Sequence, residues 1–212
     1  MKICCISDTH EKHQYLDIPE CDVLVCAGDY NLSTEWDMDK LNHWFGTLKD
    51  KVGRIVFVAG NHDFALQSAN SIYLEHLFTN ATYLEDSSVI IDGVKFYGTP
   101  WCPFFNSWAF MESHDFLKTN REKIPEDTDV LISHCPPFGI MDHVRRANGD
   151  LGQSQGCASL RDRIKLIKPK LSVFGHMHEG YGQYTDYTTD YVNASCMDEM
   201  YAFVNKPILI EI

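Results

Sequence analysis

The sequence has little positive charge and lacks a long apolar run. Its 212 residues contain 18 Lys and Arg against 30 Asp and Glu, which gives a formal net charge of -12. Such a chain repels polyanions as a whole, so we expect no duplex nucleic acid as a partner, although local cations could still admit a small anionic substrate. No apolar run approaches the roughly 20 residues of a membrane helix, and no apolar segment of signal-peptide length follows Met1, so we expect a cytoplasmic protein without membrane attachment.

The eight cysteines include no Cys-x-x-Cys pair. Several lie in apolar runs, and a chain of this length can build its core without disulfides. We therefore expect free, buried thiols in a reducing compartment rather than a disulfide framework or a thiolate zinc site. Internal repeats, low-complexity tracts and linkers are also lacking, so residues 1–212 are expected to form one domain.

Strands and helices alternate in the first part of the chain. Short apolar runs predict strands at Lys2–Ser7, Asp22–Ala27, Arg54–Ala59, Val89–Asp92, Val94–Gly98, Asp129–Ser133, Lys170–Phe174, Tyr181–Thr185, Tyr187–Asn193 and Pro207–Ile212. Helices are expected at Trp36–Lys49, Ser71–Phe78, His114–Lys123 and Cys157–Ile167. Asp92-Gly93 predicts a two-residue hairpin, and the polar segment Asp142–Gln155 predicts a mobile loop. This pattern indicates an α/β fold with mixed sheets.

Polar clusters follow five of these strands. They are Asp8-Thr9-His10, Gly28-Asp29, Gly60-Asn61-His62-Asp63, His134 and Gly175-His176-Met177-His178. In extended backbone, side chains two positions apart point to the same side, so the paired residues of the first and last clusters can face one point. Ligands of α/β sheets bind outside the carboxyl ends of the strands, where all five clusters lie.

The clusters together supply a donor set for metal ions. The candidate ligands are Asp8, His10, Asp29, Asn61, His134, His176 and His178. Imidazole, carboxylate and amide oxygen without thiolate suit Mn, Fe, Zn, Co or Ni. Seven donors exceed what one ion uses, so we expect two divalent ions that share the Asp29 carboxylate. Two such ions can lower the pKa of a water held between them and clamp an in-line displacement at phosphorus. His62 follows the candidate ligand Asn61 and suits the role of general acid; a structural hydrogen-bonding role is the alternative for this residue.

The five motifs resemble, in order and spacing, those of the calcineurin-like metallophosphoesterases. The resemblance implies a four-layer α-β-β-α sandwich of two mixed β-sheets flanked by helices. It also implies a dinuclear centre. One ion would be held by Asp8, His10, Asp29 and His178, and the other by Asp29, Asn61, His134 and His176, with His62 near the scissile bond.

A narrower likeness is carried by Thr99-Pro100-Trp101, Pro136-Pro137, His178-Glu179-Gly180-Tyr181-Gly182 and Asn193-Ala194-Ser195. These segments resemble the metallophosphoesterase-domain-containing branch, whose members are similar to class III cyclic-nucleotide phosphodiesterases. Two positions depart from the pattern. Tyr30 stands where an aliphatic residue or Phe is usual, and Cys135 stands where Gly is common.

Substrate contacts are expected from Asn61, His62, Trp101, Arg145 and Arg146. The two arginines could meet a second phosphate or a base, or could simply be solvated. Trp101 and Trp108 lie in an aromatic segment, residues 99–113, that could either stack a nucleobase or pack on the core.

The activity we expect is hydrolysis of phosphodiesters, such as cyclic or other small nucleotides, by attack of a metal-bridging hydroxide, with Mn favoured. Asp29 and His62 are the expected catalytic residues. A phosphomonoesterase acting on nucleotides or phosphoproteins is one alternative, and a non-catalytic module that binds a nucleotide or protein is another. A homodimer is left open by the sequence.

Overall fold

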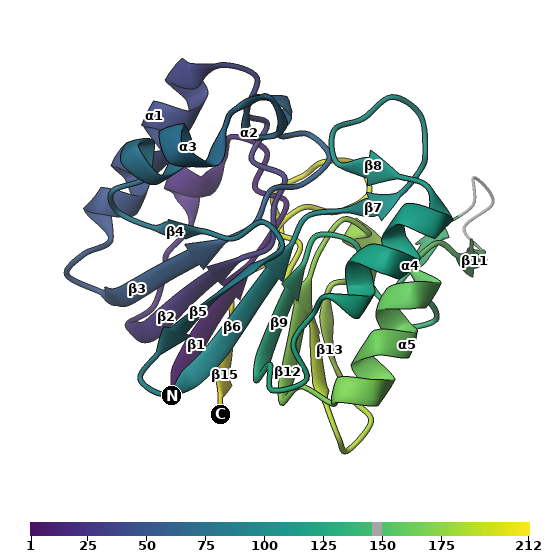
Figure 1. Ribbon diagram of the computed structural model, residues 1–212. Coiled ribbons are helices and arrows are strands. Elements are labelled where there is room, and N and C mark those ends of the chain that lie inside the picture. Colours follow the sequence, from purple (N-terminus) through teal and green to yellow (C-terminus); the bar gives the residue numbers. More distant parts are fainter. Residues whose placement is uncertain (146–149) are drawn as a thin grey trace.

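The computed structural model describes residues 1–145 and 150–212, which fold into two facing mixed sheets (Figure 1). The first sheet has the strand order β15-β1-β2-β3-β4. Its strands are β1 (Lys2–Ile6), β2 (Cys21–Cys26), β3 (Val52–Phe57), β4 (Thr82–Tyr83) and β15 (Ile208–Glu211). Strands β1 to β4 run parallel, and β15 is antiparallel to β1. The amino group of Met1 consequently bonds to the carbonyl of Ile212 at 2.7 Å.

The second sheet has the order β13-β14-β12-β9-β6-β5. Its strands are β5 (Ser87–Ile91), β6 (Val94–Thr99), β9 (Val130–Ser133), β12 (Leu171–Phe174), β13 (Gly182–Thr185) and β14 (Asp190–Asn193). The four inner strands are parallel, and each edge strand is antiparallel to its neighbour. The predicted hairpin is confirmed between β5 and β6, where Asp92 and Gly93 both have positive φ, 49° and 83°, as a tight two-residue turn requires.

Helices cover the outer faces of both sheets. Helices α1 (Glu35–Thr47), α2 (Phe64–Ser68) and α3 (Ser71–Leu77) lie beside the first sheet, and α4 (His114–Glu122) and α5 (Ala158–Ile167) cover the second (Figure 1). Thr34 caps α1 in a reciprocal capping box with Asp37, which fixes where this helix begins. None of the helices in the described chain combines the length and apolar character needed to cross a membrane.

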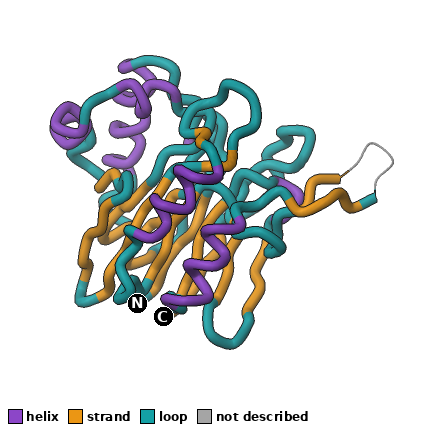
Figure 2. The backbone as a smooth tube through the Cα atoms, turned by 45° about the vertical axis from the view of Figure 1, so that its right-hand side comes forward, coloured by secondary structure: helices purple, strands orange, loops and turns teal. Residues whose placement is uncertain are grey.

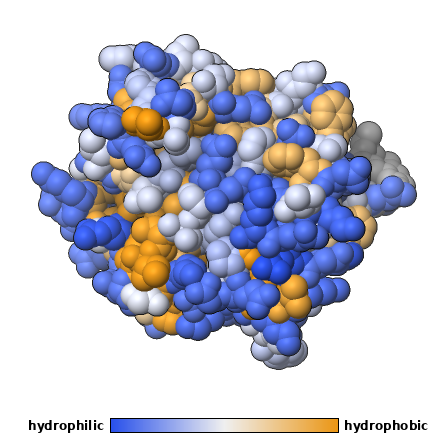
Figure 3. All heavy atoms as spheres, viewed as in Figure 1, coloured by the Kyte–Doolittle hydropathy of each residue, from blue (hydrophilic) through white to orange (hydrophobic). Residues whose placement is uncertain are grey.

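Side-chain alternation along the strands separates the layers. Cys4 and Ile6 of β1 pack among helix residues such as Phe45, whereas Ile3 and Cys5 pack in the cluster between the two sheets. A third cluster joins the outer face of the second sheet to α4 and α5. The four-layer sandwich of two mixed sheets flanked by helices is therefore confirmed. Hydrophilic side chains cover most of the face seen in Figure 3, and the apolar ones form small patches.

The described part of the segment 142–155 differs from its prediction as a loop, while residues 146–149 of that prediction lie outside the described residues. Within it, β10 (His143–Arg145) and β11 (Leu151–Ser154) form an antiparallel ladder with an irregularity between the two paired positions. The carboxylate of Asp142 accepts the backbone N–H groups of Gly139 and Gly156 and closes the base of this ladder. The polar composition of the segment did not predict the ladder, because the two strands pair through backbone groups. A short parallel pair, β7 (Cys102–Pro103) and β8 (Met111–Glu112), lies in the aromatic segment.

The parallel strands that precede the five polar clusters end at one edge of the sandwich. Strands β1, β2 and β3 belong to the first sheet and β9 and β12 to the second. Their carboxyl ends point away from the edge where the two chain termini lie (Figure 1). The loops gather at this opposite edge (Figure 2). An isolated bridge between Ser7 and Ser195 joins the sheets there.

Candidate metal centre

The turns that carry the predicted ligands have strained backbones. Asp8, His10, Asp29 and His176 have φ values of 51°, 40°, 58° and 66°, in the left-handed region that residues other than Gly seldom adopt. Such conformations persist where surrounding contacts fix them, and they concentrate at functional sites. The strain therefore marks the edge where the five strands end.

Glycines let these turns approach one another closely. A Cβ on Gly60 would overlap the Asp29 carboxylate, and a Cβ on Gly175 would overlap the carboxylate of Asp8 and the side chain of Ser7. Any larger residue at either position would displace a carboxylate that faces the site. The two glycines thus hold the backbones at the distance that the site needs.

Three ligand atoms converge in a first group. The donors of Asp8, His10 and His178 all lie within 4.8 Å of one another, and all three residues are buried. His178 Nε2 lies 3.5 Å from Asp8 Oδ1. Both oxygens of Asp8 also accept the backbone N–H of His176, at 3.1 and 3.0 Å, which ties β1 to the turn after β12.

A second group lies beside the first. The donors of Asp29, His134 and His176 are likewise within 4.8 Å of one another. His134 Nε2 lies 3.3 Å from Asp29 Oδ1 and 3.0 Å from the amide oxygen of Asn61. The other oxygen of Asp29, Oδ2, lies 3.9 Å from His10 Nε2 in the first group. Asp29 thus presents one oxygen to each group.

Hydrogen bonds on the far side of the imidazoles set their tautomers. His134 Nδ1 lies 2.8 Å from the carbonyl of Ala27, and His178 Nδ1 lies 2.9 Å from the carbonyl of Asp198. A carbonyl only accepts, so each Nδ1 carries the proton, and in the neutral ring Nε2 offers its lone pair toward the group. Metal-ligating histidines are oriented in this way.

The residues present fit a bound cation. His10 Nε2 is buried and has no hydrogen-bond partner among the described residues, although it lies 3.9 Å from Asp29 Oδ2. An unpaired buried nitrogen is costly unless another species completes its coordination. Buried carboxylates, imidazoles and an amide oxygen, without thiolate, are suitable donors for a divalent ion.

Electrostatics within the site favour positive charge. Burial raises the pKa of Asp29, but the charge of His134 and its hydrogen bond outweigh burial and hold this pKa well below its usual range. Burial lowers the pKa of His134, yet the Asp29 carboxylate raises it to about 9. The hydrogen bond to Asp8 raises the pKa of His178 to about 9 in the same way, against the effect of burial. His176 behaves oppositely, because burial and the charge of His134 lower its pKa to about 4.

Asp63 supports the site from behind. Its buried carboxylate accepts four backbone N–H groups, those of Asp29, Tyr30, Leu32 and Gly60, at 2.8 to 3.1 Å. These donors belong to the turns after β2 and β3, so one side chain fixes the relative position of two candidate ligands. Its place beside Asn61 and His62 was evident from the sequence, but this role was not.

His62 lies at the rim of the two groups. Its backbone N–H donates to Asp29 Oδ1 at 2.8 Å, and its ring Nε2 lies 3.9 Å from Asp29 Oδ2. The ring meets that of His10 edge to face, with centroids 5.0 Å apart. Burial lowers the pKa of His62, although the charge of Asp29 acts in the opposite direction.

The remaining predicted substrate residues lie in different settings. Trp101 donates its indole N–H to Asp86 at 2.8 Å, and its ring packs between Phe110 and Phe116. Arg145 lies on β10, where its backbone N–H donates to Glu179 of the short helix η2 (His178–Gly180). Arg146 lies outside the described residues.

The two departures from the family pattern are both buried. The ring of Tyr30 packs 6.0 Å from that of Phe57 in the core beneath the helices. Cys135 donates its thiol to the carbonyl of Trp101 at 3.5 Å, and its hydrogen bond with Cys102 and its burial raise its pKa, so the thiol stays protonated.

Two aromatic residues meet the site: Tyr201, which the sequence did not assign to it, and Trp108, for which the sequence left base stacking or core packing open. Tyr201 places its ring 5.0 Å from the rings of both His10 and His178. Trp108 places its ring 4.3 Å from that of His62. Tyr201 follows no strand and belongs to no motif, so only the folded chain reveals it.

Two facing mixed sheets with carboxylate and histidine groups at their shared edge place the chain among the metal-dependent hydrolases. The model of the calcineurin-like phosphoesterase family matches residues 1–180, and the chain belongs to this family. The resemblance seen in the sequence is confirmed. The chain is a metal-dependent phosphoesterase, and the family binds divalent metal ions.

Similar proteins support this membership. Metallophosphoesterase domain-containing protein 1 of Homo sapiens is 35% identical over 236 residues, which cover 100% of this chain and 71% of the relative. The protein of the same name from Mus musculus gives the same values. A solved crystal structure with 16% identity and a TM-score of 0.62 covers 99% of this chain and 98% of its own, which shows a likeness of fold.

Proposed function

We propose that this chain hydrolyses phosphodiesters with the help of two divalent cations, preferably Mn. The supporting observation is the placement of Asp29, whose Oδ1 lies 3.3 Å from His134 Nε2 while its Oδ2 lies 3.9 Å from His10 Nε2. A carboxylate set between two donor groups can serve one ion with each oxygen. Asp8, His10 and His178 would complete one ion's ligands, and Asn61, His134 and His176 the other's.

When bound, such a pair of ions supplies Lewis-acid polarisation of a phosphoryl oxygen and a water nucleophile of lowered pKa. The chain's own residues supply orientation. Asp63 holds the turns of Asp29 and Gly60 together. The carbonyl of Ala27 orients the ring of His134, and the carbonyl of Asp198 orients the ring of His178.

His62 is the proposed proton donor to the leaving oxygen. Its backbone is fixed by Asp29, and its ring stands at the rim of the groups. A proton donor needs a position within reach of the leaving oxygen, and general acid catalysis of this kind typically contributes about 10²- to 10⁴-fold.

The surroundings of the two groups support a diester as substrate. Side chains that contact them include the amide of Asn31, which lies 3.0 Å from His10 Nδ1, and the ring of Tyr201. Both are neutral groups. A diester carries one negative charge and a monoester close to two, so the diester suits these neutral neighbours better.

We further infer a reducing, cytoplasmic location. All eight cysteines are unpaired and buried in the structure. Free buried thiols are typical of reducing compartments.

The test is metal depletion followed by reconstitution. Chelator-treated protein should lose hydrolysis of bis(p-nitrophenyl) phosphate and regain it with Mn, with a kcat/KM above that for p-nitrophenyl phosphate. The Asp29→Ala variant should bind less than two Mn per chain and stay inactive, whereas Asp17→Ala, at a side chain 96% exposed, should behave as the wild type. Activity that survives both the chelator and Asp29→Ala would overturn the proposal, and a higher kcat/KM for the monoester would replace a diesterase with a monoesterase.

A further inference from the structure

The loop that bears Trp108 is attached to the metal-site turn. The backbone N–H of Ala109 donates to the carbonyl of Asn61 at 3.1 Å, and Ala109 and Phe110 are fully buried. These contacts hold the Trp108 ring 4.3 Å from the ring of His62, with 40° between the ring planes. The position of Trp108 relative to His62 is thus set by backbone and core, not by the surface of the loop.

Trp108 and Phe64 form an aromatic surface beside His62. Each side chain is 40% exposed, and their ring centroids are 6.2 Å apart. Phe64 begins α2, two residues after His62, so the same turn positions the rings of His62 and Phe64. Trp101 differs, because its ring is packed between Phe110 and Phe116 and its N–H is already bonded. Exposed aromatic rings next to a catalytic group offer a surface for a planar ligand.

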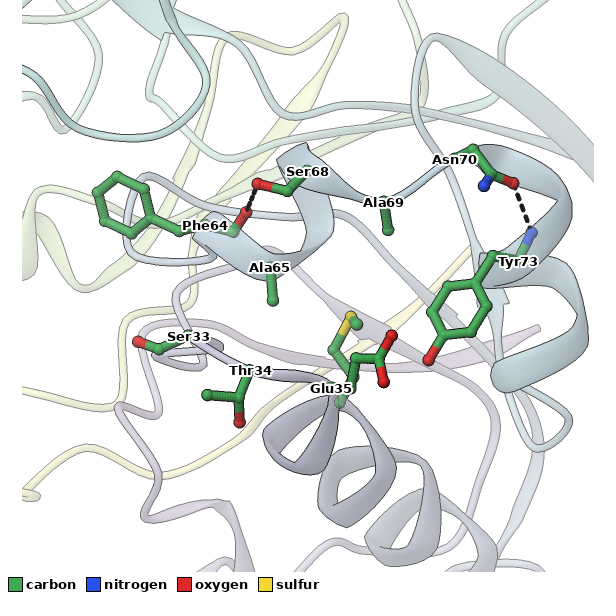
Figure 4. A pocket seen from close by; sticks show the side chains of 10 residues that line it. Ser33, Thr34, Glu35, Phe64, Ala65, Ser68, Ala69, Asn70 and Tyr73 are labelled. Atoms are coloured by element: carbon green, nitrogen blue, oxygen red, sulfur yellow. Dashed lines mark hydrogen bonds between the residues drawn. The ribbon is translucent and has the colours of Figure 1, made fainter.

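A cavity adjoins the aromatic surface at Phe64. Phe64 lines one end of a hollow of about 460 Å³ between the start of α1 and helices α2 and α3, while Asn70 and Tyr73 line the other end (Figure 4). Glu35 contributes a carboxylate to its lining. A negative charge there disfavours a second phosphate and suits a neutral group with hydrogen-bond donors.

We propose that Trp108, with Phe64 beside it, binds the planar ring of the substrate's leaving group and so determines specificity. The inference rests on the proposed function, because it takes His62 as the proton donor to the leaving oxygen. The group that departs must then lie on the His62 side, against Trp108. Base stacking on an aromatic side chain changes affinity by about 5- to 150-fold.

The test compares two non-hydrolysable phosphinates, which like a diester carry one negative charge, on the Mn-loaded protein by isothermal titration calorimetry. Benzyl(methyl)phosphinate has a methylene in place of the leaving oxygen and carries a ring, whereas ethyl(methyl)phosphinate has the same charge and no ring. The wild type should bind benzyl(methyl)phosphinate about 5- to 150-fold tighter. Trp108→Leu should remove most of this preference and leave the affinity for ethyl(methyl)phosphinate unchanged, and Trp108→Phe should restore part of it.

Trp36 provides the matched control, since it is 69% exposed on α1 and is not among the cavity's lining residues. Trp36→Leu should keep the full preference for the ring. A preference that persists in Trp108→Leu, with ethyl(methyl)phosphinate binding intact, would overturn this inference and leave the proposed function standing. Failure of both phosphinates to bind the wild type would overturn both.

Discussion

His62 contacts both oxygens of Asp29, with its backbone N–H 2.8 Å from Oδ1 and its ring Nε2 3.9 Å from Oδ2. The candidate proton donor and the candidate shared ligand are therefore linked through the backbone of His62. Because the backbone contact does not depend on the imidazole, the ring can be removed without disturbing the turn.

His62→Ala should consequently affect chemistry and not metal binding. We expect kcat for an alkyl diester, whose leaving group needs a proton, to fall by about 10²- to 10⁴-fold. For bis(p-nitrophenyl) phosphate, whose leaving group departs as an anion, the loss should be much smaller. Steady-state kinetics with both substrates measure this difference, and the exposed His43→Ala variant is the control. Equal losses on the two substrates would contradict the role as proton donor.

Asp63→Asn should destabilise the fold and loosen the site. The Asn side chain keeps one acceptor oxygen but turns an NH₂ group toward backbone N–H donors that Asp63 now satisfies. Leaving buried donors unpaired costs roughly 1–3 kcal/mol. Urea unfolding measures the change, and Asp17→Asn should cost less than about 1 kcal/mol, because it removes only an exposed ion pair with Lys51. An Asp63→Asn variant as stable as the wild type, with equal Mn affinity, would refute this account.

Metal binding should release protons and strengthen as pH rises. Although burial lowers the pKa of His134 and His178, the neighbouring carboxylates raise both to about 9, above the ordinary value of 6.5. In metal-free protein these protonated rings stabilise the fold fully below pH 6.5, and that contribution is lost as pH rises through about 9. A cation must displace both protons, so Mn affinity should fall as pH drops below about 9.

Calorimetry in buffers of different ionisation enthalpy counts the released protons. At pH 7 we expect His134→Gln to release about one proton fewer per chain than the wild type on Mn binding, because one of the two charged rings is then absent. If Mn binding releases no protons, or if the Mn affinity does not change between pH 6 and 9, the two rings are neutral before the metal binds.

His13 should make stability sensitive to acid independently of the metal. Burial, followed by the charge of Lys40, lowers its pKa from 6.5 to about 4, and its buried Nδ1 has no hydrogen-bond partner in the described part of the chain. A depressed pKa contributes stability that is present above pH 6.5 and is lost as pH falls toward 4. His13→Gln should cost stability at pH 7, because the ring packs on Trp44, but the deficit should shrink by pH 4.5. Urea unfolding at both values tests this, and a constant deficit would contradict it.

The sequence predicted mixed sheets and the edge at which the site lies, because both depend on local pattern, whereas the four layers were expected from the family resemblance. Period-two alternation in β1 sends Ile3 and Cys5 to one face and Cys4 and Ile6 to the other. The Asp-Gly pair predicted the hairpin because few other dipeptides accept positive φ at both positions. Side chains grouped at strand ends predicted a common edge, since parallel strands finish on the same side.

What the sequence did not predict depends on contacts between distant segments. Tyr201 reaches His10 across nearly the whole chain, and no local pattern encodes that approach. Trp101 and Trp108 had similar sequence surroundings, yet one packs beneath α4 and the other faces His62. The β10–β11 ladder joins polar residues through backbone bonds, which composition does not record.

The donors of each candidate group come from both sheets, since Asp8 and His10 follow β1 while His178 follows β12, and Asp29 follows β2 while His134 follows β9. A cation bound by either group would cross-link the two sheets, and neither sheet alone supplies all the ligands of that group. Depriving the protein of such ions would then weaken its resistance to heat in proportion to the logarithm of their concentration, as for any ligand that recognises only the assembled form.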